Sequence, residues 1–544
     1  MSPIPMNGIL SLEGVSVRLP PGADRSHAMR DISLSVAAGE ILCVVGESGS
    51  GKSMTANAIM RLLPPGVALD GGRILFEGRD LASLDEWDMR RVRGAGVAMI
   101  FQEPMTALNP LMRIGDQIGE TLSIHTDMDA KARRAKVLSL LAEVHIPNPQ
   151  AAADAYPHEL SGGQRQRAMI AGALALDPRL LIADEPTTAL DVTTQAQILK
   201  LIRDLQRRKG TGVLFITHDF GVVAEIADRV AVMRQGEVVE TGPTEEILTR
   251  PTHPYTQQLL AAVPSLRAPP PRPISDETVL SIENLAKTYR NRSLFGRARR
   301  VTHALQGVSM ALPRGGTIGV VGESGSGKST LARCLMRLIE PDGGAIRLDR
   351  EDLVPLSGRA LHEQRRRIQI VFQDPFASLN PRRRAGELVA QGPMVYGASR
   401  ADAMKRAADL FALVGLDPSA MTRYPHEFSG GQRQRIGLAR ALALEPDVLI
   451  ADEPVSALDV SVQAQVLALL ADLRLRLGLS ILFITHDLRV AAQICDLIVV
   501  MKDGVVVEAG PTGRLFEHPQ HPYTKALLDA VPGAARERGA APPI

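Results

Sequence analysis

The sequence predicts an α/β protein that contains two copies of one domain, each with a mostly parallel sheet covered by helices. Two observations carry this prediction. The octet GESGSGKS occurs at 46–53 and again, letter for letter, at 322–329. In each half, short apolar runs of strand length also alternate with segments that suit helices. Such alternation is typical of a parallel sheet that is buried on both faces.

Length and composition are consistent with a multidomain globular protein. The chain has 544 residues, of which 45% are hydrophobic and 22% charged. Its 62 basic residues are balanced by 60 acidic ones, which gives no electrostatic reason to expect nucleic-acid binding. The sequence shows no signal peptide and no charge-free apolar run near the ~18 residues that span a bilayer. We therefore expect a cytosolic chain, or one attached to a membrane through other proteins.

Further repeats indicate that a whole domain is duplicated. The strings SGGQRQR, IADEP, FITHD and HPYT each recur 268 residues later in the chain. A period this long excludes a solenoid, so each copy is expected to have its own core. Composition then predicts the domain boundaries. They are a first domain over 1–264, a proline-rich linker over 265–278, a second domain over 279–532 and a flexible tail over 533–544.

Each octet lies between a predicted strand and a predicted helix. In the first half the strand covers 41–45 and the helix 54–63. Later apolar runs predict more strands at 179–184 and 212–217, and at 447–452 and 480–485 in the second half. A helix is expected between such strands, for example over 193–208.

The octet fits the phosphate-binding pattern G-x-x-x-x-G-K-[ST]. Its glycines allow a tight turn whose N–H groups converge, and the next helix presents its positive N-terminus there. The lysine can reach the β- and γ-phosphates of a nucleotide, and the serine can ligate Mg²⁺. A plain glycine-rich turn is the alternative, which the repeated strand–loop–helix context disfavours. The expected binding residues are Gly46, Glu47, Ser48, Gly49, Ser50, Gly51, Lys52 and Ser53, and Gly322, Glu323, Ser324, Gly325, Ser326, Gly327, Lys328, Ser329 and Thr330.

Two acidic pairs follow predicted strands. Asp184 and Asp452 end apolar runs, at the sheet edge where α/β proteins bind ligands, and are candidate Mg²⁺ ligands. Glu185 and Glu453 come next and are candidates to orient or deprotonate an attacking water. An acidic pair alone is a weak signal, but its coupling to a phosphate loop in both halves makes it strong.

Two histidines occupy matched positions. His218 and His486 follow apolar runs in the strings ITHD. A single histidine of this kind is more often structural than catalytic. Because both stand at the carboxyl end of a strand beside the predicted site, we interpret them as catalytic.

The string SGGQRQR points to a family. Phosphate loop, FQ, SGGQ, IADEP, ALD and THD, in that order and twice, resemble the nucleotide-binding domain of ABC transporters over nearly the whole chain. The resemblance implies two P-loop NTPase domains of the RecA-like type. Each would have a helical subdomain that carries the signature SGGQ and a small antiparallel β subdomain. It also implies ATP and Mg²⁺ as cofactors, and ATP hydrolysis coupled to transport.

In that family the signature of one domain completes the ATP site of the other. A helix start with a serine and glycines offers hydroxyl and N–H groups to a γ-phosphate, although SGGQ alone could be only a helix cap. The resemblance implies that Lys52 pairs with Ser429 and Lys328 with Ser161, so one chain carries its own head-to-tail dimer. The signature residues are Ser161, Gly162, Gly163 and Gln164, and Ser429, Gly430, Gly431 and Gln432.

The resemblance assigns further roles. Gln102 and Gln373 would touch Mg²⁺ or the attacking water. The family also stacks adenine on an aromatic residue ahead of the phosphate loop, which Tyr289 matches in the second half. Leu19 stands at the corresponding place in the first half and has no π-face, so we expect weaker nucleotide binding there. Both sites are otherwise complete, and both are expected to hydrolyse ATP.

Several further strings of the sequence resemble the importer branch of the family that takes up dipeptides, oligopeptides and nickel. The fusion of two ATP-binding domains in one chain is similar to the organisation of glutathione importers. The HPYT segments are the most specific of these details, although on residues alone they could be packing elements. The resemblance implies two transmembrane permease subunits and an extracytoplasmic substrate-binding protein as partners, with no nucleic acid. It places this chain peripherally, on the cytoplasmic face of the inner membrane. The resemblance also implies two D-loops, TTALD at 187–191 and VSALD at 455–459, which end in Asp191 and Asp459.

Two alternatives stay open. The arginine-rich run 290–300 is interpreted as an exposed hairpin loop, with contact to anionic lipids as the other reading. The rival function is that of a soluble tandem ABC ATPase that acts on ribosomes or DNA. The short proline-rich linker and the HPYT segments favour the importer.

Overall fold

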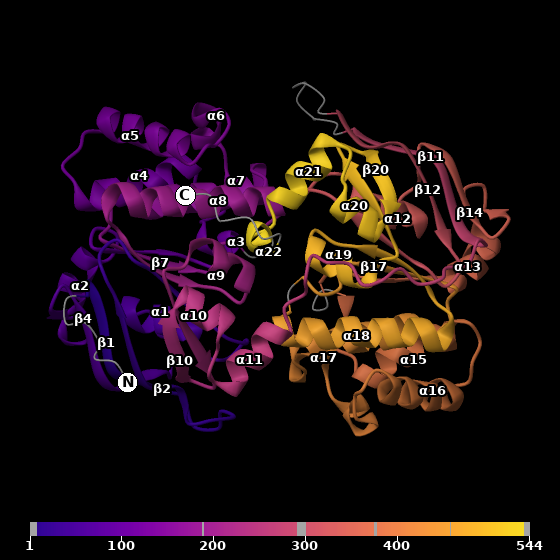
Figure 1. The fold of residues 1–544 in the computed structure, drawn as a ribbon, viewed down its shortest axis with the longest axis horizontal. Helices are drawn as coiled ribbons and strands as arrows, with labels where there is room; N and C mark the ends of the chain where they lie inside the picture. The colour runs from indigo at the N-terminus through magenta and orange to yellow at the C-terminus, as the bar shows by residue number, and fades with distance from the viewer. Residues whose placement is uncertain (1–7, 188–189, 291–300, 375–377, 457, 538–544) are drawn as a thin grey trace. The chain divides into compact units, whose positions relative to one another are not determined.

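The computed structural model describes residues 8–187, 190–290, 301–374, 378–456 and 458–537, which form two compact units (Figure 1). The first unit contains the described residues up to 190 and 194–263. The second contains 264–537 together with 191–193. Both units repeat the same order of strands, and each has its own layers and core.

A six-stranded sheet forms the centre of the first unit. Its strand order is β10-β9-β3-β8-β7-β6, and all neighbours are parallel except β10, which runs antiparallel to β9. Every residue of β3, β6, β7 and β8 is buried, which explains why these strands are apolar without alternation. The strands are β3 (Ile41–Val45), β6 (Val97–Ile100), β7 (Leu180–Asp184), β8 (Gly212–Ile216), β9 (Arg229–Arg234) and β10 (Glu237–Pro243).

The second unit repeats this sheet with the order β16-β17-β18-β13-β19-β20. Here too only the outer strand, β20, is antiparallel to its neighbour. The predicted parallel sheets are therefore confirmed. The strands are β13 (Thr317–Val321), β16 (Ile368–Val371), β17 (Val448–Asp452), β18 (Ser480–Ile484), β19 (Leu497–Lys502) and β20 (Val505–Pro511).

Each unit also has the small antiparallel sheet that the family resemblance implied. The strand orders are β2-β1-β4-β5 and β12-β11-β14-β15. The first sheet contains β1 (Leu10–Arg18), β2 (His27–Val36), β4 (Ala68–Phe76) and β5 (Arg79–Asp80). The second contains β11 (Thr278–Arg290), β12 (Val301–Pro313), β14 (Gly343–Leu348) and β15 (Glu351–Asp352). Arg290, the first residue of the arginine-rich run, pairs with Val301, and the rest of the run, 291–300, lies outside the described residues.

Helices cover the sheets and form the implied helical subdomain, which comprises α4 to α7 in the first unit and α15 to α17 in the second (Figure 1). The first half of the chain contains α1 (Lys52–Met60), α2 (Glu86–Val92), α3 (Pro104–Ala107), α4 (Ile114–His125), α5 (Ala130–Glu143), α6 (Pro149–Asp154), α7 (Gly162–Ala173), α8 (Val192–Lys209), α9 (Phe220–Ile226), α10 (Thr244–Thr249) and α11 (Pro254–Ala261). The second half contains α12 (Lys328–Leu335), α13 (Gly358–Arg367), α15 (Ala385–Val395), α16 (Arg400–Leu413), α17 (Gly430–Leu442), α18 (Val460–Leu477), α19 (Leu488–Ile494), α20 (Thr512–Glu517), α21 (Pro522–Asp529) and α22 (Ala534–Glu537). Helix α1 ends earlier than predicted because Arg61 adopts a left-handed conformation, with φ of 51°. No helix among the described residues has the length and apolarity needed to cross a bilayer.

The start of the proline-rich segment is bound to the second unit. Gln493 of α19 donates hydrogen bonds to the carbonyls of Ser265 and Arg267, at 2.7 and 2.9 Å. Further along, Arg272 forms an ion pair with Asp496 at 2.5 Å. The segment is mostly exposed, as expected, but these contacts fix its course along one unit.

The beginning of the expected flexible tail is structured instead. Residues 534–537 form α22, and Glu537 accepts a hydrogen bond of 3.0 Å from the backbone N–H of Leu266, whose side chain is buried. Arg489 pairs with the same carboxylate. The physical reason is that a buried arginine requires an anionic partner, which this part of the chain supplies. Residues 538–544 lie outside the described part.

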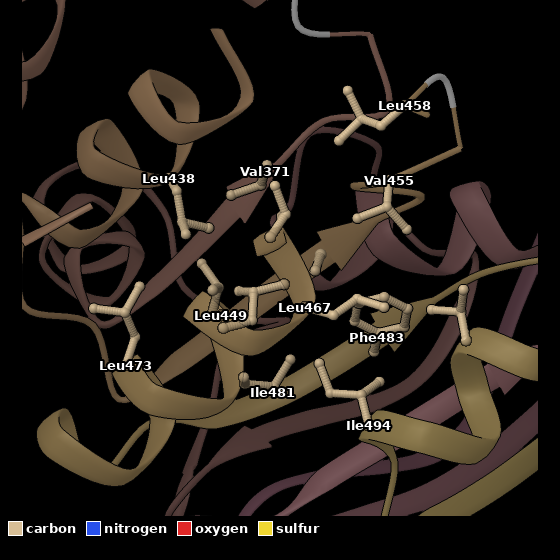
Figure 2. Close-up of a cluster of buried hydrophobic side chains, with 14 of the residues drawn as sticks. Val371, Leu438, Leu449, Val455, Leu458, Leu467, Leu473, Ile481, Phe483 and Ile494 are labelled. Atoms are coloured by element: carbon tan, nitrogen blue, oxygen red, sulfur yellow. The ribbon is translucent and has the colours of Figure 1, made fainter. Parts of the chain in front are cut away.

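Part of the core of the second unit lies between its parallel sheet and α18. Figure 2 shows Leu467 and Leu473 of α18 packed with Leu449 and Phe483 of the sheet. All four are buried, and Phe483 is completely so. Because β17 and β18 end at the predicted site, this packing also supports that edge of the sheet.

Two leucines of α18 provide a matched test of this packing. Leu473 is 1% exposed and Leu475 is 73% exposed. We expect Leu473→Ala to lower the free energy of unfolding by about 2–5 kcal/mol, because it leaves a cavity in the core. Leu475→Ala should change it by no more than about 0.5 kcal/mol. Urea denaturation of the full chain followed by circular dichroism measures both, and equal effects would contradict the packing described.

Candidate functional site

Four neighbouring strands bring the predicted catalytic segments of the first unit to one edge of its sheet. In the order β3, β8, β7 and β6, their carboxyl ends lead into the octet, His218, the acidic pair and Gln102. The second unit places its own four segments in the same way, through β13, β18, β17 and β16. The octets form the loops that follow β3 and β13, and Thr330 lies in the first turn of α12.

The first glycine of each octet has no room for a side chain. Gly46 and Gly322 have φ of 155° and 151°. A Cβ at Gly46 would lie 2.2 Å from the carbonyl oxygen of Met233, and one at Gly322 would lie 2.2 Å from that of Met501. Only glycine therefore allows the loop to turn back against the neighbouring strand.

Each octet lysine is buried and held by the loop itself. Lys52 Nζ donates to the carbonyls of Gly46 and Glu47 at 2.8 and 2.9 Å, and Lys328 makes the two equivalent bonds at 2.8 Å. Burial lowers the pKa of Lys328, while the nearby carboxylates of Glu453 and Asp452 oppose that change. The geometry thus places a cationic group inside the concavity of the loop.

The loop also offers polar groups that fit a phosphate. The hydroxyls of Ser50 and Ser326 are buried without a hydrogen-bond partner among the described residues. A buried hydroxyl without a partner is costly unless a ligand or water satisfies it. With the lysine and the start of α1 or α12 beside them, these hydroxyls suit an anionic ligand.

The octet serine contacts the aspartate of the neighbouring strand in both units. Ser53 Oγ donates to Asp184 at 3.0 Å, and Ser329 Oγ donates to Asp452 at 3.4 Å. Burial raises the pKa of Asp184 to about 6 and also raises that of Asp452. These oxygen donors fit Mg²⁺, which binds one or two carboxylates and completes its shell with phosphates and water. Among the described residues, no group of three or more His, Cys, Asp or Glu side chains could hold a metal ion.

The glutamate that follows each aspartate is held by a glutamine and a histidine. In the second unit, Glu453 Oε2 accepts from Gln373 Nε2 at 2.7 Å and lies 3.2 Å from His486 Nδ1. Burial would raise the pKa of Glu453, but the hydrogen bond and charge of His486, together with Lys328, hold it below its ordinary value. Glu453 is therefore an oriented carboxylate, the form that a general base requires.

The first unit repeats this arrangement. Glu185 Oε2 accepts from Gln102 Nε2 at 3.1 Å and lies 3.3 Å from His218 Nδ1. Burial would lower the pKa of His218, but the hydrogen bond to Glu185 raises it above its ordinary value. The same balance raises the pKa of His486. The structure thus brings together the acidic pair, the histidine and the glutamine that the sequence singled out.

Each signature forms the N-terminus of a helix. Ser161 Oγ accepts from the N–H of Gln164, whose side chain accepts in return from the N–H of Ser161, so the two residues form a capping box at α7. Ser429 and Gln432 form the same box at α17. The signature glycines lie in the first turns of these helices. The string SGGQ therefore acts as a helix cap in both units. Contact of the two signatures with ATP stays a prediction.

Tyr289 lies on β11, whose partner strand β12 approaches the second octet. In the antiparallel sheet it pairs with Thr302, two residues before Ala304. The carbonyl of Ala304 would be 2.3 Å from a Cβ at Gly327, so this part of β12 touches the loop. Tyr289 is 37% exposed, which leaves its ring available to a ligand.

Leu19 occupies the matching place in the first unit. Its N–H donates to the carbonyl of Ser26 at 2.9 Å, two residues before Ala28, whose carbonyl would be 2.9 Å from a Cβ at Gly51. The side chain of Leu19 packs against the core of the antiparallel sheet. The two halves therefore differ in the surface they can offer to an adenine.

Sequence reasoning missed two tyrosines. The hydroxyl of Tyr255 accepts a hydrogen bond from the N–H of Glu47 at 3.3 Å, and Tyr523 does the same for Glu323 at 3.1 Å. These are the tyrosines of the two HPYT segments. The repeated string was visible, but nothing in it indicated contact with an octet 208 or 200 residues away.

Comparison with known proteins identifies the family. The sequence matches the ABC transporter family over residues 29–188 and 305–456. The chain belongs to the ABC transporter family. Two further regions, 239–293 and 507–544, match the C-terminal region of oligopeptide/dipeptide transporters. The ABC family is a family of ATPases, and this chain carries its ATP-binding domain twice.

The two predicted D-loops, at 187–191 and 455–459, lie partly outside the described residues.

Similar proteins include relatives of nearly the same length. The glutathione import ATP-binding protein GsiA of Escherichia coli K12 is 48% identical, with 97% of this chain and 90% of the relative covered. Its counterpart from Pectobacterium atrosepticum is also 48% identical, over 98% of this chain and 91% of the relative. Among solved structures, a dimeric post-hydrolysis state of the ATP-binding cassette MJ0796 bound to ADP and phosphate is 28% identical. It covers 43% of this chain and 98% of its own, with a TM-score of 0.40.

Glu453→Gln tests the general base. The substitution keeps the hydrogen-bonding shape but cannot take a proton, so ATP should bind and stay bound while hydrolysis falls strongly. With Glu185→Gln added, we expect ATP turnover to fall about 100-fold or more. Phosphate release and retention of labelled ATP are the measurements. Glu283→Gln, which removes an exposed partner of Arg347, is the control. Rapid turnover by the Glu185→Gln/Glu453→Gln chain would remove the base role from these two residues.

The difference between Leu19 and Tyr289 predicts unequal sites. Lys52→Ala leaves the second site to be measured, and Lys328→Ala leaves the first. We expect the first site to bind ATP about fivefold more weakly or worse, because stacking of a base on an aromatic ring is worth roughly 1–3 kcal/mol. Adding Tyr289→Leu to the Lys52→Ala chain should remove the difference. Equal affinities in calorimetric titrations would contradict the prediction.

Proposed function

We propose that this chain is the ATP-hydrolysing subunit of an importer for peptides of the dipeptide, oligopeptide or glutathione class. The observation that supports this most strongly is the presence of two complete sets of ATP-site residues on one chain, each followed by an HPYT segment. Relatives with the same fused organisation are named as glutathione import ATP-binding proteins. Each of the two HPYT segments falls in a region that matches the C-terminal region of oligopeptide/dipeptide transporters.

In each site, the octet binds the phosphates of ATP. The loop N–H groups and the lysine bind the β- and γ-phosphates, and the octet serine, the strand aspartate and the glutamine hold Mg²⁺. When bound, Mg²⁺ neutralises phosphate charge. Glu185 and Glu453 then accept the proton of the attacking water, because the glutamine and histidine beside each one keep its carboxylate oriented.

The two sites are proposed to be shared between the halves of the chain. Lys52 would act with Ser429, and Lys328 with Ser161. Support comes from the capping boxes, which hold each signature serine at an exposed helix start. A γ-phosphate bound by both halves joins them, and its hydrolysis removes the shared contacts. This change is what would drive the permease.

The importer reading implies partners. Two transmembrane permease subunits and an extracytoplasmic substrate-binding protein would complete the transporter. This chain would then sit peripherally, on the cytoplasmic face of the inner membrane. No nucleic acid is expected as a partner, because the charges are balanced overall.

Purification of the tagged full chain from detergent-solubilised membranes tests this proposal. Two multi-span membrane proteins are expected to copurify, and an exported binding protein should join them when substrate is present. Recovery of ribosomes or DNA-repair proteins instead would overturn the importer and favour the rival tandem ATPase. In cells, the Glu185→Gln/Glu453→Gln chain should assemble with the same partners but abolish uptake of labelled glutathione or dipeptide. Undiminished uptake would contradict coupling to ATP hydrolysis.

A further inference from the structure

We propose that Tyr255 and Tyr523 are positioning residues of the two phosphate loops, through which each HPYT segment sets the orientation of the ATP-binding lysine. This inference rests on the proposed binding of ATP phosphates by the octets. It goes beyond that proposal because it assigns a function to a segment outside the ATP-binding domain's own motifs.

The argument begins with a single peptide group. In the first unit, the peptide group that joins Gly46 to Glu47 is held at both ends. Its carbonyl accepts from Lys52 Nζ at 2.8 Å, and its N–H donates to Tyr255 at 3.3 Å. Because a peptide group is planar, it cannot rotate without disturbing both bonds. The hydroxyl of Tyr255 therefore fixes the orientation of the Gly46 carbonyl, and that carbonyl in turn holds Lys52 Nζ.

The second unit repeats the arrangement. The carbonyl of Gly322 accepts from Lys328 Nζ at 2.8 Å, and the N–H of Glu323 donates to Tyr523 at 3.1 Å. The same three-part contact in both units, from elements far apart in sequence, indicates a shared geometric requirement rather than incidental packing.

This peptide group needs such a restraint because glycine precedes it. Gly46 and Gly322 must be glycine to fit against the neighbouring strand, as described above. Glycine, however, has no Cβ to limit rotation about its backbone bonds, so the carbonyl it carries is free to turn. A hydrogen bond to the far side of the same peptide group removes that freedom.

The tyrosine itself is held by a built support. His253 Nδ1 caps α11 by accepting from the N–H of Tyr255 at 3.1 Å. Glu240 of β10 accepts from the N–H groups of Thr252 and His253 at 2.7 and 3.3 Å. The helix start is thus tied to the sheet, and the proline of HPYT occupies the first helical position, where no N–H is required.

The corresponding support in the second unit is the same. His521 Nδ1 accepts from the N–H of Tyr523 at 3.2 Å, and Glu508 accepts from the N–H groups of Gln520 and His521 at 2.8 and 3.1 Å. Burial raises the pKa of Tyr523 to about 12, as it does for Tyr255. Both phenols are therefore neutral near pH 7, and their oxygens are acceptors for the loop N–H.

The test removes the hydroxyl and keeps the ring. In a Lys328→Ala chain, which reports the first site, Tyr255→Phe should weaken Mg·ATP binding about two- to tenfold, as expected for one hydrogen bond. Tyr523→Phe in that same background makes an identical chemical change beside the disabled site, and should leave the affinity unchanged. Tyr396→Phe is a second control, because that hydroxyl donates to the carbonyl of His362 at 2.7 Å, away from both octets. Calorimetric titration measures the affinity.

Thermal unfolding without nucleotide separates positioning from stability. The Tyr255→Phe chain should unfold at the same temperature as its parent, because the packed ring remains. Unchanged affinity for Mg·ATP would overturn the inference, and so would an equal loss from Tyr523→Phe. A separate variant tests the proposed binding of ATP phosphates by the octets, on which this inference rests. If the Lys52→Ala/Lys328→Ala chain binds ATP as well as the unmodified chain, the octet lysines do not bind the phosphates and the proposed function fails.

Discussion

Each unit depends on a loop turn that leaves no space for a side chain. At Gly46, a Cβ would collide with the carbonyl of Met233 on β9, a strand that flanks β3. The turn directs the loop back over the sheet, so that α1 begins with its N–H groups and Lys52 facing the loop. The edge of the sheet then supplies the remaining groups, because β8, β7 and β6 end beside the loop in that order.

The sequence was sufficient for the central sheet and for the residues at its edge, for physical reasons. Strands such as β7 and β17 are buried on both faces, so they are continuous apolar runs that are visible without an alignment. The phosphate loop is local, since its glycines, lysine and helix are contiguous in the chain. Predictions based on local composition were less successful. The segment around residue 534 was expected to be flexible, but it forms a helix because Glu537 meets a buried arginine from another part of the fold.

Long-range contacts to backbone groups could not be predicted. The hydroxyl of Tyr255 contacts the N–H of Glu47, and a backbone N–H has no residue-specific pattern in the sequence. The course of the linker was hidden for the same reason, because Gln493 binds it through the carbonyls of Ser265 and Arg267. A repeated string such as HPYT indicates that a geometric requirement exists. Only the structure shows which atoms meet it.

Duplication within one chain lets the two sites be compared as an internal control. The groups proposed to act on the attacking water are matched closely, since each glutamate contacts a glutamine and a histidine. The residues predicted to contact the nucleotide base are not matched, since an exposed Tyr289 stands where the other half has a packed Leu19. The tyrosine support of the loop belongs to the matched set. It is therefore associated with the phosphate end of the site, and the C-terminal region that carries it is part of the ATP-binding machinery rather than an appendage to it.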